Sequence, residues 1–276
     1  MFKRLLHHLK RGRLTIVGKP IFMFLVNMEL LYENILDQLF SPDFETTFVN
    51  ETLTAVIKTF ERPNELKRLV KSIKQFYPEI KIIIVDDSKI PSSLEDVKII
   101  IMPYDSGVSA GRNMALSEVK TPYFLLLDDD FIFCRQTDLE QALEKMHKNL
   151  EIDIIGGEVL NLPLYTTTKY LNAGLYPNKK SSVLENGTVI DGMKVQDKVA
   201  NFYIGRTDSI KELGWDNNIK RLDHADFFTR AKGVLLTVFN PDFKVLHAQT
   251  PYNKNYMKKR NDYKSDKKLL HEKYYN

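Results

Sequence analysis

The chain is poor in the features that stabilise secreted or membrane-spanning proteins. Its 276 residues include a single cysteine, Cys134, so no disulfide can form within the chain, which fits a reducing compartment. Residues 21–40 are apolar but interrupted by Asn27, Glu29, Glu33 and Asp37, whereas a membrane span requires about 20 mostly apolar residues. A Lys-Pro pair at residues 19–20 interrupts any signal-peptide core. We therefore expect residues 21–40 to form one or two helices that pack against a folded domain.

Charge is distributed unevenly along the chain. The net charge is +4, but residues 1–28 carry +6 without a single acid, residues 253–276 carry +5, and the middle carries −7. Basic chain ends around an acidic middle are more typical of a protein whose periphery contacts a negatively charged surface than of one with a nucleic-acid-binding core. The aromatic-rich basic motifs of RNA-binding proteins are also missing from the sequence. We expect no nucleic-acid partner.

The first residues allow two interpretations. Apolar residues recur at helical spacing between Phe2 and Leu9, with basic residues among them, which is typical of a helix on an anionic membrane surface. A terminal helix docked on its own domain gives the same pattern, and both interpretations stay open. We expect residues 1–50 to be a helical extension, residues 51–250 the main domain, and residues 251–276 a basic tail.

From residue 52 the chain alternates strand and helix patterns. Strands are expected at 52–58, 81–85, 98–102, 123–127, 152–158, 202–204, 235–239 and 244–247, and helices at 63–76, 107–119, 138–149, 208–213 and 223–232. Between residues 162 and 199 the pattern loosens into short strands and turns. This order predicts an α/β fold with a mostly parallel central sheet flanked by helices.

One apolar strand pattern ends abruptly in three adjacent carboxylates, Asp128, Asp129 and Asp130. Unpaired buried charge is costly, so the acids belong at the end of the strand, where open α/β folds bind ligands. Asp128 and Asp130 lie two residues apart and can aim at one point. Hard oxygen ligands there suit Mn²⁺ or Mg²⁺, and such a cation can hold a diphosphate. On its own the triplet is equally consistent with an acidic turn.

Three longer segments carry a family resemblance. They are IKTFERPNELKRLVKSIKQFYPEIKIIIVDDS at 57–88, MPYDSGVSAGRNMALSEVKTPYFLLLDDDFIF at 102–133, and VANFYIGRTDSIKELGWDNNIKRLDHADFFTRAKG at 199–233. In this order they resemble the catalytic domain of the β1,4-N-acetylgalactosaminyltransferases, inverting, metal-dependent enzymes of the GT-A fold. The GT-A fold is a Rossmann-like fold of nucleotide-diphospho-sugar transferases. The resemblance implies a UDP-sugar donor, Mn²⁺ (or Mg²⁺) as the cofactor, and a glycan or glycolipid acceptor.

The resemblance assigns the first segment to the nucleotide. Thr59 and Arg62 follow the first strand, and Asp86 and Asp87 follow the next one. Carboxylates in this place can accept hydrogen bonds from the uracil N–H or the ribose hydroxyls. Which of Asp86 and Asp87 contacts uridine stays open, and a turn or helix-cap role is the alternative for both.

The second segment adds a phosphate contact and the metal site. Arg112 lies in a run of small residues at a helix start, where free N–H groups and a forked donor suit phosphate oxygens. A solvated arginine at a helix start is the alternative. The resemblance makes Asp130 the metal ligand and places Asp128 on the ribose or the metal. We count Asp129 among the nucleotide-sugar contacts, although we expect its side chain to point away from those of Asp128 and Asp130.

The third segment supplies the catalytic base. Inverting transfer is a single displacement, so one carboxylate must take the proton of the acceptor hydroxyl. The resemblance matches Asp226 to the family's acid, which is more often glutamate. Asp223 is the alternative base, and a purely structural role at the start of a helix is the alternative for Asp226. The resemblance also implies Trp215 and Asp216 as acceptor contacts and His247 as a metal ligand. Core packing of Trp215 and a structural role of His247 are the alternatives.

The sequence therefore predicts an inverting glycosyltransferase that moves a sugar, N-acetylgalactosamine, from UDP to a glycan hydroxyl. Two alternatives stay open: another donor (UDP-galactose, UDP-glucose or UDP-N-acetylglucosamine), because donor choice depends on few contacts, and a degenerate glycan-binding scaffold. The membrane-spanning stalk of the family's Golgi enzymes is not seen in this sequence. We expect a bacterial enzyme of surface polysaccharide synthesis (capsule or lipooligosaccharide), cytoplasmic and peripheral on the inner face of the membrane.

Overall fold

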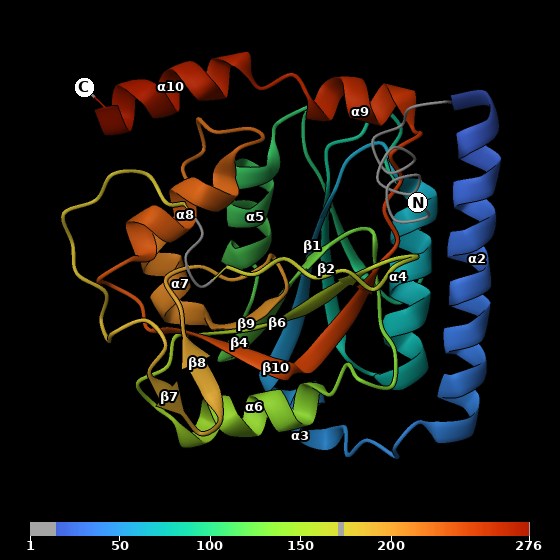
Figure 1. Ribbon diagram of the computed structural model, residues 1–276, viewed down its shortest axis with the longest axis horizontal. Coiled ribbons are helices and arrows are strands. Elements are labelled where there is room, and N and C mark those ends of the chain that lie inside the picture. The colour runs from blue at the N-terminus through green and yellow to red at the C-terminus, as the bar shows by residue number, and fades with distance from the viewer. Residues whose placement is uncertain (1–14, 171–173, 276) are drawn as a thin grey trace.

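A mixed ten-stranded sheet forms the centre of the computed structural model, which describes residues 15–170 and 174–275 (Figure 1). The strands follow the order β3-β2-β1-β4-β9-β6-β10-β8-β7, and β5 pairs with β10. The strands are β1 (Leu53–Thr59), β2 (Lys81–Asp86), β3 (Lys98–Ile101), β4 (Tyr123–Asp128), β5 (Phe131–Ile132), β6 (Ile154–Asn161), β7 (Val189–Ile190), β8 (Met193–Val195), β9 (Tyr203–Arg206) and β10 (Thr237–His247). The pattern between residues 2 and 9 lies outside the described residues.

Helices cover both faces of the sheet. They are α2 (Thr15–Phe40), α3 (Thr47–Thr52), α4 (Pro63–Phe76), α5 (Val108–Ser117), α6 (Leu139–Lys148), α7 (Thr207–Leu213), α8 (Asp223–Ala231), α9 (Lys254–Arg260) and α10 (Lys264–Tyr275). Buried side chains of α4 and α6 share one core cluster with the sheet, and those of α5, α7 and α8 share another. The structure thus confirms the predicted α/β class.

Parallel pairing sets the position of the functional residues. Strands β1, β2 and β4 are buried along almost their whole length, as expected of parallel strands covered on both faces. The register pairs Thr59 with Asp86 and Lys58 with Asp128. Since parallel strands end at the same edge of a sheet, these side chains all emerge at one edge. The carboxylates predicted at strand ends are therefore gathered there by the register.

The observed elements differ from the predicted ones in two places. The strands expected at 235–239 and 244–247 form a single strand, β10, because its pairing with β6 continues across an irregularity between Phe239 and Lys244. Strand β9 runs antiparallel between β4 and β6 and makes the sheet mixed. The expected helix or helices at 21–40 form one helix, α2, with Pro20 inside it.

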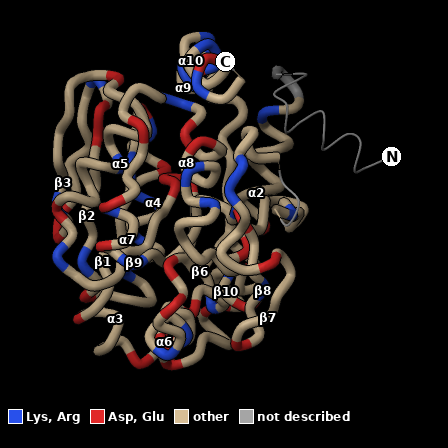
Figure 2. The backbone as a smooth tube through the Cα atoms, turned by 90° about the vertical axis from the view of Figure 1, so that its left-hand side faces the viewer, with Lys and Arg blue, Asp and Glu red and all other residues tan. Residues whose placement is uncertain are grey.

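The C-terminal segment crosses the edge of the sheet where β1, β2 and β4 end. Helices α9 and α10 lie along one end of the molecule (Figure 1), and Lys and Arg residues recur along them (Figure 2). Asp266 of α10 accepts hydrogen bonds from the backbone N–H groups of Arg221 (2.6 Å) and Leu222 (3.0 Å). These bonds fix the tail to the start of α8. Within residues 15–170 and 174–275, no helix has the length and apolar character needed to cross a membrane.

Candidate functional site

A cleft opens at the edge of the sheet where β1, β2 and β4 end. It has a volume of about 170 Å³, and we call it the strand-end cleft. Its lining residues are Lys58, Phe60, Arg62, Val108, Arg112, Asp128, Asp129, Asp130, Asn201, Arg221, Asp223, His247, Tyr256 and Arg260. Asp128, Asp223 and His247 also line an adjoining cavity of about 330 Å³. The fold thus brings together residues from both ends of the main domain and from the tail.

Arg62 holds two of the three adjacent carboxylates. Its Nη1 donates to Asp129 Oδ1 at 2.8 Å, and its Nη2 donates to Asp130 Oδ2. Asp129 also accepts a hydrogen bond from Thr59 Oγ1 at 2.7 Å. Burial raises the pKa of Asp129 to about 6, although the charge of Arg62 opposes this rise. Asp129 is thus occupied by Arg62 and Thr59, and all three side chains are buried.

Asp130 also contacts His247. The distance between His247 Nε2 and Asp130 Oδ2 is 3.1 Å. Burial alone would raise the pKa of Asp130, but the charges of His247 and Arg62 outweigh it and hold this pKa below its ordinary range. His247 Nδ1 lies 2.9 Å from Asn161 Oδ1, which also accepts a bond from Gln249 Nε2 at 3.1 Å. Asn161 therefore holds the Nδ1–H and turns Nε2 toward Asp130.

Arg112 bridges a second pair of carboxylates. Its Nη2 donates to Asp128 Oδ1 at 2.9 Å, and its Nη1 donates to Asp223 Oδ2. The Asp128 side chain is 39% exposed, whereas that of Asp130 is 4% exposed, so Asp128 is the more accessible of the two. Burial raises the pKa of Asp223, and the adjacent charge of Arg112 opposes this rise. Two arginines thus compensate four acids around the cleft.

The donor set fits a cation that is shared with a bound diphosphate. In the part of the chain that the structure describes, no three His, Cys, Asp or Glu side chains converge into a ready metal site. Asp130 and His247 nevertheless present an oxygen and a nitrogen to the same point. Mg²⁺ is commonly held by one or two carboxylates together with substrate phosphates and water rather than by a cage of protein ligands. Two protein ligands therefore suffice for this type of site.

The predicted uridine contacts are engaged within the protein. Asp86 accepts hydrogen bonds from the N–H groups of Ser88 and Ser92, both at 2.8 Å. Asp87 pairs with Lys58 and accepts a bond from Gly107 N–H at 3.0 Å. Both carboxylates are fully buried, and neither lines the strand-end cleft. They stabilise the loops beside the cleft, and a direct contact with uridine stays a prediction.

The two candidate bases occupy different surroundings. Asp223 lines the strand-end cleft, whereas Asp226 does not. Asp226 is 1% exposed, and its oxygens accept bonds from Arg230 Nε (2.9 Å), Lys273 Nζ (2.7 Å) and Tyr274 Oη (2.6 Å). These contacts join α8 to α10. The geometry favours Asp223 as the carboxylate that reaches a bound substrate.

The predicted acceptor contacts lie outside the cleft. Trp215 is 5% exposed and stacks on Phe227, with 4.8 Å between the ring centroids. Asn113 accepts a bond from Trp215 N–H at 2.9 Å and fixes this turn. Asp216 forms an ion pair with Lys273 at 2.7 Å. These contacts pack Trp215 against Phe227 and attach the tail to Asp216. The acceptor role of both residues stays a prediction.

Several lining residues were not found from the sequence. Lys58 is the only charged residue of β1, and a lone charge in an apolar strand is a signal that could have found it. Phe60 lies under Lys58 and Arg221, at 5.2 Å and 5.7 Å from its ring centroid. Tyr256 stacks on Arg62 at 4.4 Å, and Arg260 follows one helical turn later. No local pattern could have placed these tail residues at the cleft.

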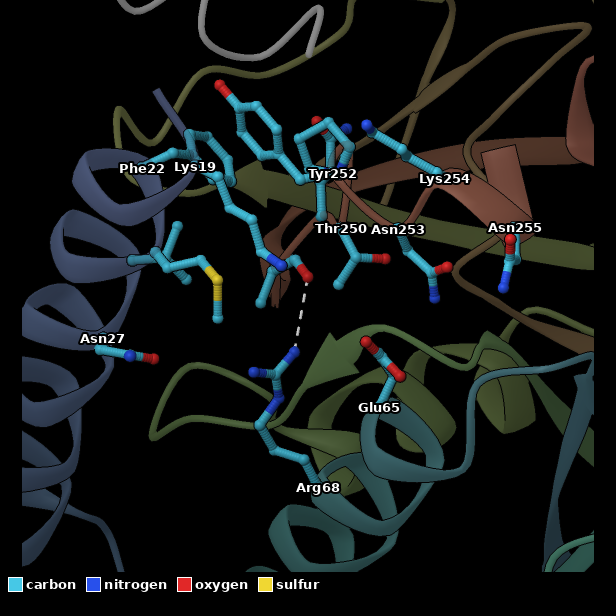
Figure 3. A pocket seen from close by; sticks show the side chains of 15 residues that line it. Lys19, Phe22, Asn27, Glu65, Arg68, Thr250, Tyr252, Asn253, Lys254 and Asn255 are labelled. Atoms are coloured by element: carbon cyan, nitrogen blue, oxygen red, sulfur yellow. Dashed lines mark hydrogen bonds between the residues drawn. The ribbon is translucent and has the colours of Figure 1, made fainter. Parts of the chain in front are cut away.

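A larger cavity of about 570 Å³ lies beside the cleft, between α2, α4 and residues 248–255 (Figure 3). Phe22 and Lys19 enter it from α2, and Arg68 enters it from α4 and donates to the carbonyl of Ala248 at 3.4 Å. Thr250, on its wall, accepts a bond from Arg62 Nη2 at 3.2 Å. The cavity and the strand-end cleft are therefore separated by one layer of side chains.

Comparisons with known proteins concern the family and the fold of the chain. Residues 54–180 match the family model described as glycosyl transferase family 2. Beta-1,4 N-acetylgalactosaminyltransferase 1 of Mus musculus is 34% identical over 211 residues, which cover 72% of this chain and 39% of that protein. Beta-1,4 N-acetylgalactosaminyltransferase 2 of Mus musculus is 35% identical over 222 residues, which cover 78% of this chain and 42% of that protein. The chain thus spans about two fifths of the length of these relatives.

Solved structures resemble the fold. S. aureus TarS 1–349 in complex with UDP-GlcNAc superposes with a TM-score of 0.55 at 15% identity, over 72% of this chain and 59% of that chain. GalNAc-T7 with UDP, GalNAc and Mn²⁺ gives a TM-score of 0.52 at 15% identity, over 81% of this chain and 54% of that chain. At this level of identity the likeness concerns the fold alone. It confirms the predicted GT-A fold.

Proposed function

This chain belongs to the glycosyl transferase family 2, with β-1,4 N-acetylgalactosaminyltransferases among its relatives, and we propose that it is an inverting, metal-dependent glycosyltransferase. It moves N-acetylgalactosamine from a UDP-sugar to a hydroxyl of a glycan. The observation that carries this proposal is the Asp130–His247 pair at the ends of β4 and β10, with Asp128 and two arginines lining the same cleft.

The cleft has the charges and surfaces that a UDP-sugar requires. Lys58, Arg62, Arg112, Arg221 and Arg260 line it and supply positive charge for a diphosphate. Phe60, also on its wall, offers an apolar ring for uracil. Asp86 and Asp87 hold the loops on the nucleotide side, where either would contact uridine after a rearrangement of its present bonds.

Asp130 and His247 would hold a divalent cation, Mn²⁺ or Mg²⁺, together with the donor's phosphates, and Asp128 would face the ribose or the cation. A bound cation would offset the negative charge that develops on the departing diphosphate. Asn161 keeps His247 Nε2 directed at this point. Arg62 holds Asp130 in place and balances its charge.

We assign the base role to Asp223 and keep Asp226 as the sequence-based candidate. The acceptor hydroxyl attacks the anomeric carbon from the face opposite the diphosphate, and its proton passes to a carboxylate oxygen of the base. The bond between the anomeric carbon and the phosphate oxygen breaks, and its electron pair leaves with UDP. An α-linked donor therefore gives a β-linked product. The position of Asp223 at the cleft and its raised pKa both support this assignment.

The acceptor and the cellular place are further parts of the proposal. We propose a glycan or glycolipid acceptor, in bacterial surface polysaccharide synthesis, for an enzyme that works in the cytoplasm at the inner face of the membrane. The basic ends of the chain, +6 over residues 1–28 and +5 over residues 253–276, support contact with an anionic surface. Trp215 and Asp216 stay candidates for acceptor contact.

A donor screen with purified protein tests the proposal. We expect UDP release from UDP-N-acetylgalactosamine with Mn²⁺, and none when a chelator is added. Release from UDP-galactose, UDP-glucose or UDP-N-acetylglucosamine instead would keep the mechanism and replace the donor. Metal-dependent UDP binding without release from any donor would support the alternative of a non-catalytic glycan-binding subunit. If UDP itself does not bind, the transferase proposal fails.

A further inference from the structure

Helix α2 has its acidic residues on the inner side. Glu29 and Glu33 accept hydrogen bonds from the Tyr165 hydroxyl at 3.0 Å and 2.8 Å. Glu33 and Asp37 also pair with Arg135, at 2.6 Å and 3.4 Å. Three acids of one helix thus point at the protein. This distribution is the reverse of that expected for a helix whose outer face meets water.

The outer side of α2 is apolar. Its exposed apolar side chains, with their exposed fractions, are Ile21 (42%), Met23 (49%), Phe24 (63%), Met28 (48%), Leu31 (53%), Tyr32 (55%), Ile35 (45%), Leu39 (67%) and Phe40 (67%). The other exposed residues from Pro20 to Phe40 are uncharged. Such a large continuous apolar surface marks a site that contacts a partner or a membrane.

The spacing of these side chains indicates the shape of what covers them. In a heptad, Ile21, Met28 and Ile35 take the first position, and Phe24 and Leu31 take the fourth. Tyr32 and Leu39 take the fifth position, and the next fourth position is polar, Gln38. A pair of helices needs only the narrow seam of the first and fourth positions, whereas a helix lying on an extended apolar phase presents this wider stripe.

Basic residues precede the exposed face of this helix in the sequence, and further lysines lie beside it in the structure. Residues 1–19 contain six Lys and Arg residues and no acid. Lys19 of α2 and Lys254 of α9 line the same cavity, so the basic start of α9 lies beside the start of α2 (Figure 3). Lys254 and Lys258 are exposed and lie one helical turn apart. Anionic lipid headgroups complement such a cluster.

We propose that the outer face of α2 lies in the interfacial layer of an anionic lipid bilayer, with Lys19, Lys254 and Lys258 on the lipid phosphates. Met23 of this outer face also lines the cavity between α2 and α4, so docking would bring that cavity, one layer of side chains from the strand-end cleft, beside the membrane. This inference deepens the proposed function, on which its link to a membrane-bound acceptor rests.

Vesicle binding by the purified full chain tests the docking face. The test compares sedimentation with phosphatidylglycerol–phosphatidylcholine vesicles and with pure phosphatidylcholine vesicles. The variant Phe24→Gln/Leu31→Gln removes two exposed apolar side chains without changing charge. The matched control Ile90→Gln/Leu150→Gln does the same at positions that are 82% and 74% exposed elsewhere. We expect the α2 variant to bind anionic vesicles at least about tenfold more weakly, because apolar burial drives interfacial binding.

The control should bind as the unchanged protein does, and binding should weaken at high salt or without the anionic lipid. Loss of binding in both variants alike, or no binding to anionic vesicles by the unchanged protein, would overturn the proposal. A dimer in vesicle-free solution that Phe24→Gln/Leu31→Gln abolishes would assign the face to a second copy and also overturn it. UDP release with a soluble acceptor and no vesicles reports the proposed activity separately, so that the two failures are distinguishable.

Discussion

His247 Nε2 lies 3.1 Å from Asp130 Oδ2, although the two residues come from opposite halves of the chain. The antiparallel pairing of β5 with β10 brings them together, because Phe131, which follows Asp130, is the register partner of His247. A short two-residue strand thus sets the candidate cation site. Because this pairing positions both side chains, a substitution of either residue tests the candidate cation site.

Asp130→Asn should remove the metal-dependent activity. The amide keeps the shape of the side chain but loses the negative charge that a divalent cation requires. We expect kcat/KM to fall by about 100-fold or more, since a bound cation is worth several kcal/mol to the leaving group. Calorimetric titration of UDP with and without Mn²⁺ would check this: the Mn²⁺ enhancement of UDP binding should disappear in the variant. An enhancement equal to that of the unchanged protein would exclude Asp130 as a ligand.

Asn161→Ala tests positioning without touching the cation site directly. Asn161 Oδ1 holds the Nδ1–H of His247, so its loss should let the ring turn and weaken cation binding by about 10–100-fold. The readout is the Mn²⁺ concentration at half-maximal activity, which should rise, while activity at saturating Mn²⁺ recovers. A lower maximal rate with an unchanged Mn²⁺ dependence would point to a structural role alone.

Asp223→Asn and Asp226→Asn should separate the base from a structural carboxylate. At the cleft, Asp223→Asn should lower kcat by about 10²–10⁴-fold with little effect on UDP-sugar binding. At the contact between α8 and α10, Asp226→Asn should weaken the bonds from Arg230 and Lys273 and lower stability by about 1–3 kcal/mol. Turnover, donor titration and urea unfolding measure the three effects. The opposite pattern, with turnover lost only in Asp226→Asn, would restore Asp226 as the base.

Arg260→Gln should raise the KM for the UDP-sugar. Arg260 lines the strand-end cleft from α9 and is exposed, so its removal should leave folding unchanged. One charge-assisted hydrogen bond is worth about 1.5–3 kcal/mol, which corresponds to an increase of about tenfold or more. Lys264→Gln removes the same charge from an exposed tail residue and serves as the control. Equal KM values in the two variants would show that Arg260 gives the donor no specific contact.

His224 should make stability fall in mild acid. Burial and the charge of Lys198 lower the pKa of His224 to about 3, while His224 Nε2 donates to the carbonyl of Val199 at 2.7 Å. An unfolded histidine has a pKa of about 6.5, so below that pH the unfolded state binds the extra proton. The favourable contribution is present above pH 6.5 and is lost as the pH falls toward 3. Urea unfolding at pH 7 and pH 5 measures this loss.

The matched variant for this prediction is His224→Gln, which cannot take up a proton. Between pH 7 and pH 5 the unchanged protein should lose about 1–2 kcal/mol more unfolding free energy than the variant. Equal losses in the two proteins would show that His224 is protonated in the folded state as readily as in the unfolded one. The difference between the two proteins removes the contribution of the carboxylates to the unfolding free energy, because they titrate in both.

Local patterns determined the elements that contain long regular runs. The apolar run before Asp128 predicted β4, and the apolar face of residues 63–76 predicted α4, because strand and helix periodicity depend on neighbouring residues only. The α/β class followed from the order of these patterns. The antiparallel insertion of β9 could not be read from the sequence, since pairing partners are chosen by contacts between distant segments.

The sequence by itself determined that carboxylates stand at strand ends, and it predicted a nucleotide-sugar site there. Only the tertiary structure decided which of them meet. Asp223 faces the cleft while Asp226 ties α8 to α10, although the two lie on one helix and share one sequence motif. Tyr256 stacks on Arg62, which lies 194 residues earlier in the chain. Side-chain direction and long-range packing make these choices, because the free energy of a buried charge depends on the partners that the fold brings to it.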